Sequence, residues 1–322
     1  MSSTAPAADR RRVVLDTDLG TDVDDALTLA LLLGSPEVEL VGITTVYGDT
    51  DLRARATSRL LELAGVPGPG VPGGIPVRAG APTPLSGAEV WWAGHEGSLL
   101  GDLRTATTTP PAPGTSAADD AADWLAATAA AAPGEVDLLA IGPLTGVATA
   151  LRRHPELAGH LRSLVLMGGR WDGARTTDGL LEDEHNLRSD AVAAAEVLTC
   201  GAPTVVVGLE ITRQVRLEAA DVERIAAAGP LGAVLAAQVR QWWEFWDEPW
   251  GIPHDPVTAL LLVEPGVLEL GPPGRVDVDE RGAVVHVPDD RGAVRVAVGV
   301  DAERAAAAVV RRVLAGCTAS RP

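Results

Sequence analysis

The chain has 322 residues, 46% of them apolar, which is enough for one large α/β domain with a sizeable core or for two small domains. Its 26 basic and 44 acidic side chains give a net charge of −18, which argues against nucleic acid or an anionic membrane as a partner. The two cysteines do not form a disulfide framework, so we expect a reducing, cytoplasmic environment. Every long apolar stretch is interrupted by Gly, Pro or charge, so no membrane span is expected.

The start of the chain predicts a flexible tail followed by a buried strand. Residues 1–12 lack the apolar core of a signal peptide. Val13, Val14 and Leu15 then form a short apolar run that is typical of a buried strand. A buried helix is predicted at 26–33, where nearly every residue is apolar. We therefore expect one folded domain over 13–316.

An acidic loop joins this strand to this helix. It holds five aspartates within ten positions: Asp16, Asp18, Asp22, Asp24 and Asp25. So many carboxylates at the end of a buried strand repel one another unless a cation or protons compensate their charge. Oxygen ligands of this kind suit calcium or magnesium. The alternative is a solvated acidic turn in which Asp24 or Asp25 caps the helix, although a plain cap needs one carboxylate rather than five.

Strand and helix patterns alternate along most of the remaining chain. Further strands are predicted at 38–46, 75–79, 136–141, 161–167 and 204–209. Further helices are predicted at 52–64, 117–132, 146–153, 190–199, 217–228, 231–246 and 257–263. This alternation predicts a single α/β domain with a Rossmann-like, mostly parallel central sheet flanked by helices. The patterns at 276–278, 283–287 and 294–300 add a small C-terminal β meander, and a closing helix follows at 302–314.

Polar segments follow the predicted strands, at the positions where such sheets bind ligands. The segments are Tyr47-Gly48-Asp49, Gly142-Pro143, Met167-Gly168-Gly169 and, in later loops, Glu184-His185-Asn186 and His254-Asp255. The long irregular segment 82–115 carries Trp91, Trp92 and His95, and a loop of this length in a compact domain is usually functional or disordered. These groups are candidates for one shared crevice.

His254 and Asp255 are the clearest candidates for chemistry outside the acidic loop. Asp255 adds another carboxylate ligand, and His254, whose unperturbed pKa is near ~6.5, suits proton transfer at neutral pH. The alternative is a helix start, with Asp255 as the N-cap and Pro256 at the first helical position. A divalent cation can make a coordinated water a nucleophile at neutral pH, so the acidic loop and this histidine together indicate metal-assisted hydrolysis.

The acidic stretch DTDLGTDVDDA resembles the aspartate-rich N-terminal signature of the nucleoside hydrolases, of the inosine–uridine-preferring type and its relatives. The resemblance continues, in the family's order, through GITTVYGD (42–49), IPVRAG (75–80), LLAIGPLTGVATAL (138–151), LVLMGG (164–169), EHN (184–186), VVGLEIT (206–212) and HDP (254–256). It spans about nine-tenths of the chain. Several motifs in matching order make the resemblance specific.

The resemblance implies calcium-dependent hydrolysis of the N-glycosidic bond of ribonucleosides, giving base and ribose. It implies that the calcium ion is bound by Asp18, Asp25, Asp255 and the backbone carbonyl of Ile141. Asp18 would also be the general base on the attacking water, and His254 would protonate the leaving base. Members of the family are commonly homo-oligomers, so a dimer or tetramer is expected.

The resemblance also implies which residues bind the substrate. It places Asp24, Glu184 and Asn186 at the ribose hydroxyls and Met167 beside the sugar. Further substrate-binding candidates are Asp49, which stands where the family usually has an asparagine, His95 and Trp250.

The chain departs from the family pattern in ways that leave the exact substrate open. The acidic loop is two residues longer than usual, with Leu19 in place of a proline, so Asp22 or Asp24 takes the ribose role given above to Asp24. Asp178 or a neighbour stands where another ribose-binding asparagine is expected, and Glu210 replaces an aspartate.

Tryptophans near the expected site suggest how a base could be held. Trp91, Trp92 and Trp250 are candidates for stacking on the base, which is worth ~1–3 kcal/mol per base in nucleic-acid sites. For Trp242, Trp243 and Trp246 the alternative is that they are core or oligomer contacts of one helix.

Three other functions stay open at this point. The chain could hydrolyse a different N-riboside, or it could be a non-catalytic nucleoside- or ribose-binding protein that keeps the fold and the calcium. It could also be a magnesium-dependent phosphohydrolase of the haloacid-dehalogenase type, with Asp16 and Asp18 as nucleophile and acid, although that family normally has a lysine near its phosphate and this chain has none.

Overall fold

The apolar run near the start of the chain forms a central strand, β1 (Arg11–Thr17), in which Val13, Val14 and Leu15 are fully buried. The computed structural model describes residues 10–20, 22–91 and 94–318. β1 starts two residues before the predicted strand because Arg11 already pairs with the neighbouring strand, where its N–H donates to Glu37 O at 2.7 Å. Most of the predicted tail, residues 1–9, lies outside the described residues.

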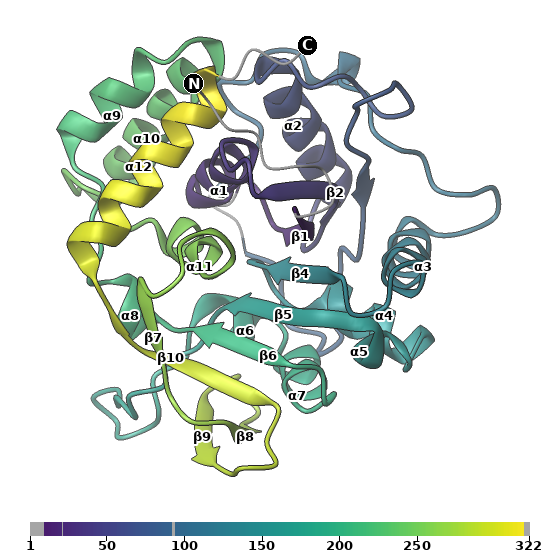
Figure 1. Cartoon of the computed structure of the whole chain (residues 1–322), viewed down its shortest axis with the longest axis vertical. Helices are drawn as coiled ribbons and strands as arrows, with labels where there is room; N and C mark the ends of the chain where they lie inside the picture. The colour runs from purple at the N-terminus through teal and green to yellow at the C-terminus, as the bar shows by residue number, and fades with distance from the viewer. Residues whose placement is uncertain (1–9, 21, 92–93, 319–322) are drawn as a thin grey trace.

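β1 lies within a ten-stranded sheet whose order is β3-β2-β1-β4-β5-β6-β10-β8-β9, with β7 paired to β10 (Figure 1). The other strands are β2 (Val38–Thr45), β3 (Val77–Ala79), β4 (Val136–Ala140), β5 (Leu161–Met167), β6 (Thr204–Val207), β7 (Leu268–Leu270), β8 (Gly274–Val278), β9 (Val284–Pro288) and β10 (Val294–Val300). All pairings from β3 to β10 along this order are parallel. The prediction of a Rossmann-like, mostly parallel sheet is confirmed.

Helices cover both faces of the sheet and bury one apolar cluster on each face (Figure 1). One face is covered by α1 (Asp24–Leu33), α2 (Thr50–Leu63), α9 (Ala219–Ala226), α10 (Pro230–Trp246), α11 (His254–Val263) and α12 (Ala302–Thr318). The other face is covered by α3 (Ala117–Ala130), α4 (Thr145–Arg153), α5 (Leu157–His160) and α7 (Ala191–Leu198). Short helices at the loops are η2 (Leu103–Thr105), α6 (His185–Ser189) and α8 (Leu209–Thr212). Within the described ranges, no helix has the length and apolarity needed to cross a membrane.

The C-terminal strands differ from the predicted meander. A meander would place its three strands in chain order, but here β10 lies next to β6 and β8 lies between β10 and β9. Val294 and Val296 of β10 are buried and pair in parallel with Thr204 and Val206 of β6. β10 therefore extends the main sheet, since its apolar residues are better buried there than at an edge, and only β8 and β9 form a hairpin.

The first and last helices pack backbone against backbone. A Cβ atom on Gly316 of α12 would lie 1.9 Å from the carbonyl oxygen of Ala30 in α1, and one on Gly34 would lie 2.0 Å from the carbonyl oxygen of Arg312. Glycine at both positions permits this close approach. The contact fixes the position of α1, which carries two of the loop aspartates at its start.

Candidate active site

A cavity of about 810 Å³ opens where the central strands end. Asp18 follows β1 directly, Ile141 follows β4, and Met167 is the last residue of β5. The predicted site residues that line the cavity are Asp18, Asp24, Asp25, Ile141, Met167, Glu184, Asn186, Trp250, His254 and Asp255. Parallel strands end at one edge of a sheet, which is why segments so far apart in the chain meet here.

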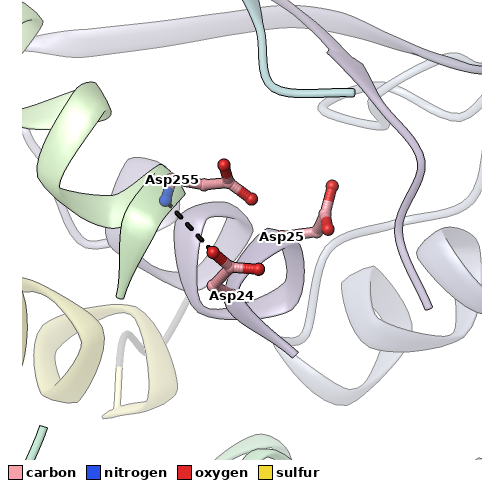
Figure 2. Close-up of side chains that lie close together, drawn as sticks. All are labelled: Asp24, Asp25 and Asp255. Carbon is pink, nitrogen blue, oxygen red and sulfur yellow. Dashed lines mark hydrogen bonds between the residues drawn. The ribbon is translucent and has the colours of Figure 1, made fainter. Parts of the chain in front are cut away.

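Three buried carboxylates converge in this cavity. Asp24, Asp25 and Asp255 each offer one oxygen, and these oxygens lie within 4.8 Å of one another. Figure 2 shows that two of the three come from the start of α1 and the third from the start of α11, where the backbone N–H of Asp255 donates to Asp24 Oδ2 at 3.3 Å. Among the described residues, this is the group of acidic, histidine or cysteine side chains with the spacing of a metal site.

The negative charges of these carboxylates are buried and repel one another. Burial, reinforced by the charges of neighbouring aspartates, raises the pKa of Asp24, Asp25 and Asp255 well above the usual range. Burial also raises the pKa of Asp22, a further lining residue, to about 7. Buried carboxylates that repel one another are stabilised by a divalent cation, and oxygen donors of this type fit a hard ion such as calcium. The donor set therefore fits the metal site expected from the sequence.

The helix-cap alternatives are wrong for both acidic segments. Val23 occupies the N-cap position of α1, so Asp24 and Asp25 lie inside its first turn. Pro253 occupies the N-cap position of α11, so Asp255 lies inside the first turn there, and the helix begins at His254 rather than at 257. The turn therefore directs these carboxylates at the cavity and at one another instead of at backbone N–H groups of their own helix ends.

Asp18 and Ile141 lie beside this group but are not part of the tight carboxylate triplet. The triplet contains Asp24 where the predicted ligand set has Asp18. The carbonyl oxygen of Ile141 accepts a hydrogen bond from Asn186 Nδ2 at 2.8 Å, and its second lone pair is left for another partner. The fifth loop aspartate, Asp16, is buried outside the cavity and accepts a hydrogen bond from Thr44 Oγ1 at 2.5 Å. Asp16 is therefore not placed as the nucleophile of a phosphohydrolase.

His254 faces the cavity with one ring nitrogen already engaged. Its Nδ1 lies 2.6 Å from Thr212 Oγ1 of α8. Burial, together with the positive charge of Arg213, lowers the pKa of His254 to about 4. The imidazole is therefore neutral near pH 7, and Nε2 is the nitrogen available to a molecule in the cavity.

The expected ribose-binding residues are held by a network around α6. Glu184 is the N-cap of α6, and its carboxylate accepts the backbone N–H groups of Asn186 and Gly169, each at 2.8 Å. Asn186 donates its amide to the carbonyl oxygens of Ile141 and Met167. These bonds fix both side chains at the cavity wall.

Two predicted substrate-binding residues lie elsewhere. Asp49 is exposed and caps α2, accepting the N–H of Leu52 at 2.9 Å, because a short polar side chain before a helix satisfies a free N–H. His95 packs behind the cavity wall, with its ring centroid 5.7 Å from that of Trp242 and 5.3 Å from that of Phe245. Neither residue lines the cavity in the structure, so the substrate-binding roles of Asp49 and His95 stay predictions.

Tryptophans of α10 belong to the cavity wall rather than to the core alone. Trp242, Trp243 and Trp246 all line the cavity, as do Trp91 and Trp250. The guanidinium carbon of Arg216 lies 4.2 Å above the ring centre of Trp250, which holds that indole in place. The predicted stacking residue Trp92 lies outside the described residues.

Sequence reasoning gave no role to several residues that shape the site, although His185 was named in one of the polar segments. His185 lines the cavity, Thr212 holds the ring of His254, and Arg53 binds carbonyl groups of the acidic loop. A signal existed for His185, since it stands between Glu184 and Asn186 in the motif that was recognised. Arg53 had no signal in the sequence, because this helix carries three arginines and its pattern does not show which of them is buried.

Comparison with known proteins places the chain in a family. A model of the family described as inosine-uridine preferring nucleoside hydrolase matches residues 13–307. Probable uridine nucleosidase 1 of Oryza sativa subsp. japonica is 34% identical over 266 residues, which cover 80% of this chain and 78% of that protein. Pyrimidine-specific ribonucleoside hydrolase RihA of Salmonella schwarzengrund (strain CVM19633) is 33% identical over 266 residues, covering 79% and 80%.

Solved structures agree with the sequence matches. The plant nucleoside hydrolase PpNRh1 superposes with a TM-score of 0.77 at 28% identity, covering 94% of this chain and 98% of that one. The family match spans nearly the whole described domain, from β1 into α12. The chain therefore belongs to the inosine-uridine preferring nucleoside hydrolase family and is a hydrolase of N-glycosyl compounds.

Proposed function

We propose that this protein hydrolyses the N-glycosidic bond of ribonucleosides in a calcium-dependent reaction that gives free base and ribose. The observation that carries the proposal is the convergence of Asp24, Asp25 and Asp255 within 4.8 Å, in a cavity that also holds a histidine and several tryptophans. The names of the relatives, uridine nucleosidase and pyrimidine-specific hydrolase, support a pyrimidine ribonucleoside such as uridine as the first substrate to test.

Calcium would be held by the carboxylates of Asp18, Asp25 and Asp255 and by the carbonyl oxygen of Ile141. When bound, it would supply a coordination site for ribose hydroxyls and lower the pKa of the attacking water. Asp25 and Asp255 belong to the group of carboxylates within 4.8 Å of one another, and Asp18 and Ile141 line the same cavity, which supports this assignment.

The sugar would lie against α6 and the end of β5. Asp24, Glu184 and Asn186 have carboxylate or amide groups at the cavity wall and would bind ribose hydroxyls, and Met167 would contact the sugar face. Because Asn186 and Glu184 are already fixed by backbone hydrogen bonds, the sugar would meet a preorganised surface.

The reaction needs a base for water and a donor for the leaving group. Asp18 would take one proton from the attacking water while the oxygen of that water bonds to the anomeric carbon. At the same time the bond from the anomeric carbon to the base nitrogen would break, and the base would take the electron pair. The surrounding carboxylates would stabilise the positive charge that develops on the sugar. A neutral His254 whose Nδ1 accepts from Thr212 carries its proton on Nε2 and would donate a hydrogen bond to the departing base. This bond would stabilise the negative charge that develops on the base, and the base would then take a proton from solvent.

The base itself would lie among the tryptophans. Trp250, backed by Arg216, and Trp91 offer flat faces at the cavity wall, and Trp242 and Trp246 of α10 extend this surface. An aromatic wall stacks on any base, so it supports binding of nucleosides without deciding which base is preferred.

The test measures reducing-sugar release from uridine, cytidine, inosine and nicotinamide riboside. Wild-type protein is assayed as purified, after chelation and after calcium is returned, beside Asp18→Asn and a matched control, Asp221→Asn, which changes a carboxylate on α9 outside the cavity. We expect release that chelation abolishes, calcium restores and Asp18→Asn lowers by about 10²-fold or more, with Asp221→Asn unchanged.

Two outcomes would contradict the proposal. Sugar release that continues after thorough chelation would show that the reaction does not depend on a metal ion. Calcium-dependent binding of uridine without any sugar release would make the protein a nucleoside-binding member of the fold.

A further inference from the structure

His185 is a cavity residue to which the proposed function gives no role. It is the first residue of α6, between two residues that would bind ribose. Its ring is held edge-on by two aromatic neighbours, with centroid distances of 5.8 Å to Tyr47 and 5.9 Å to Trp91. The ring is therefore fixed at the wall by packing, and its nitrogens have defined directions.

The Nε2 atom of this ring is buried and, within the ranges that the structure describes, has no hydrogen-bond partner. It faces a carboxylate oxygen, Oδ2 of Asp18, at 4.0 Å. Leaving a buried polar nitrogen without a hydrogen-bond partner is unfavourable, so a small movement that closes this gap is favourable. Hydrogen bonds in active sites are often long in the free protein and shorten when substrate is bound.

The other oxygen of Asp18 is confined by the backbone. A Cβ atom on Gly142 would lie 2.7 Å from Asp18 Oδ1, so this oxygen lies directly against the glycine. The carboxylate of Asp18 is thus bounded on one side by Gly142 and on the other by His185, and its side chain is nearly buried, at 5% exposed. Rotation of this carboxylate is limited from both sides.

We propose that His185 is a positioning residue for Asp18: its Nε2–H donates to Asp18 Oδ2 and fixes the orientation of the carboxylate. The inference rests on the proposed function, because it gives His185 a purpose through the base and metal ligand assigned there. The donor required is an imidazole ring that carries a proton on Nε2. Removing a residue that hydrogen-bonds to a metal ligand typically lowers metal affinity by about 10- to 100-fold.

The test is a double-mutant cycle read out by calcium binding, which does not depend on turnover. His185→Phe keeps the aromatic packing against Tyr47 and Trp91 but removes the donor, and Asp18→Asn removes the charged acceptor. Calorimetry with calcium chloride on chelated protein measures the affinity of each single variant and of the double variant. We expect His185→Phe to weaken calcium binding about 10-fold or more in the wild-type background, and to change it less than about twofold beside Asp18→Asn.

Two further variants separate positioning from simple stability. His185→Gln keeps an N–H donor near the position of Nε2, and we expect it to restore most of the lost affinity. His160→Phe is the matched control, because His160 also has a buried ring nitrogen without a partner among the described residues but lies at the end of α5, outside the cavity. It should leave calcium affinity unchanged, and thermal melting reports the folding of every variant.

The outcomes distinguish this inference from the proposed function. If wild-type protein binds calcium and hydrolyses a riboside but His185→Phe matches it in both assays, only the role of His185 is overturned. An equal loss of affinity from His185→Phe in both backgrounds would also overturn it, because the effect would then not pass through Asp18. A wild-type protein that neither binds calcium nor releases sugar would overturn the proposed function and this inference with it.

Discussion

Arg53 shows how one buried cation organises the acidic loop. Its side chain reaches from α2 under the loop, where Nε donates to the carbonyl oxygen of Tyr47 at 2.7 Å and an amino group donates to those of Asp18 and Leu19. Arg53 is only 1% exposed, and its charge opposes the rise in pKa that burial imposes on Asp25. These bonds fix the backbone at Asp18 and Leu19 despite the repulsion between the neighbouring carboxylates.

We predict that Arg53→Met lowers the free energy of unfolding by about 3 kcal/mol or more and weakens calcium binding. The substitution keeps much of the side-chain length but leaves buried carbonyl groups without donors. Urea unfolding and calcium calorimetry measure the two effects. The control is Arg55→Met on the same helix, whose salt bridge to Asp51 is partly exposed and contributes about 1 kcal/mol or less. Equal effects of the two substitutions would contradict the role given to Arg53.

At this scale the sequence predicts chemistry better than placement. The carboxylates were recognisable because negative charges crowded into one loop require a cation or protons to compensate them, whatever their exact contacts. His254 was recognisable because it stands beside another carboxylate, Asp255, and because histidine suits proton transfer near neutral pH. The sequence could not place Asp49 and His95 relative to the cavity, because a polar residue before a helix and a histidine among tryptophans also have good local roles, as a cap and as a packed ring. Only the tertiary arrangement decides between these roles.

Among the elements, the strands β1, β4 and β5 use their two ends differently. Their carboxyl ends open into the cavity, whereas near the amino end of β4 the carboxylate of Asp137 is buried. It accepts from Arg11 Nε at 2.9 Å, Arg162 Nε at 3.0 Å and Ser163 Oγ at 2.6 Å. This cluster joins the start of all three strands, away from the chemistry.

The cluster makes stability depend on pH. Burial alone would raise the pKa of Asp137, but the hydrogen bonds from Arg162, Arg11 and Ser163 outweigh it and hold the pKa below its usual range. Because the folded pKa is below the unfolded one, the stabilisation is complete above about pH 4 and is lost as pH falls through the folded pKa. We predict that Asp137→Asn lowers the free energy of unfolding by about 3 kcal/mol at pH 7, and by less at pH 3.

Urea unfolding at the two pH values measures this difference. Asp102→Asn is the control, because Asp102 forms its ion pair with Arg104 on the open surface and should have little effect at either pH. A loss of stability from Asp137→Asn that is the same at pH 3 and pH 7 would show that the ion pairs are not its source.

Element types follow well from sequence patterns, while pairing partners do not. The apolar run and buried helix at the start of the chain, and the alternation that follows, were enough to predict the parallel sheet. The position of β10 beside β6 was not predictable, since a short alternating strand fits an edge or an interior position equally well. Its neighbour is chosen by long-range burial, which local periodicity does not encode.

On the scale of the whole molecule, the contact between α1 and α12 ties the two ends of the described chain together. Figure 1 shows these helices side by side on the face that also carries α11. Through α1 and α11, this layer supports both segments that supply the three clustered carboxylates. The geometry of the site therefore depends on helix packing well outside the cavity.

We predict that Gly316→Ala lowers the free energy of unfolding by about 2 kcal/mol or more, although alanine favours helices more than glycine does. The added Cβ would lie 1.9 Å from the carbonyl oxygen of Ala30, so the two helices must separate. Chemical unfolding measures the change. Gly159→Ala is the control, because a Cβ there would have open space among the described residues, and its effect should be neutral or slightly stabilising. A neutral result for Gly316→Ala would mean that the helix contact adjusts without cost.

The same contact has a consequence for how the protein is made. α1 leaves the ribosome long before α12, so during synthesis the helix that bears Asp24 and Asp25 lacks the surface it later packs against. The nascent chain then carries a set of mutually repelling carboxylates on an element that is not yet held in place. Maturation of the cavity is thereby coupled to the arrival of residues near the C-terminus, and until they arrive the exposed face of α1 is a natural site for chaperones to recognise.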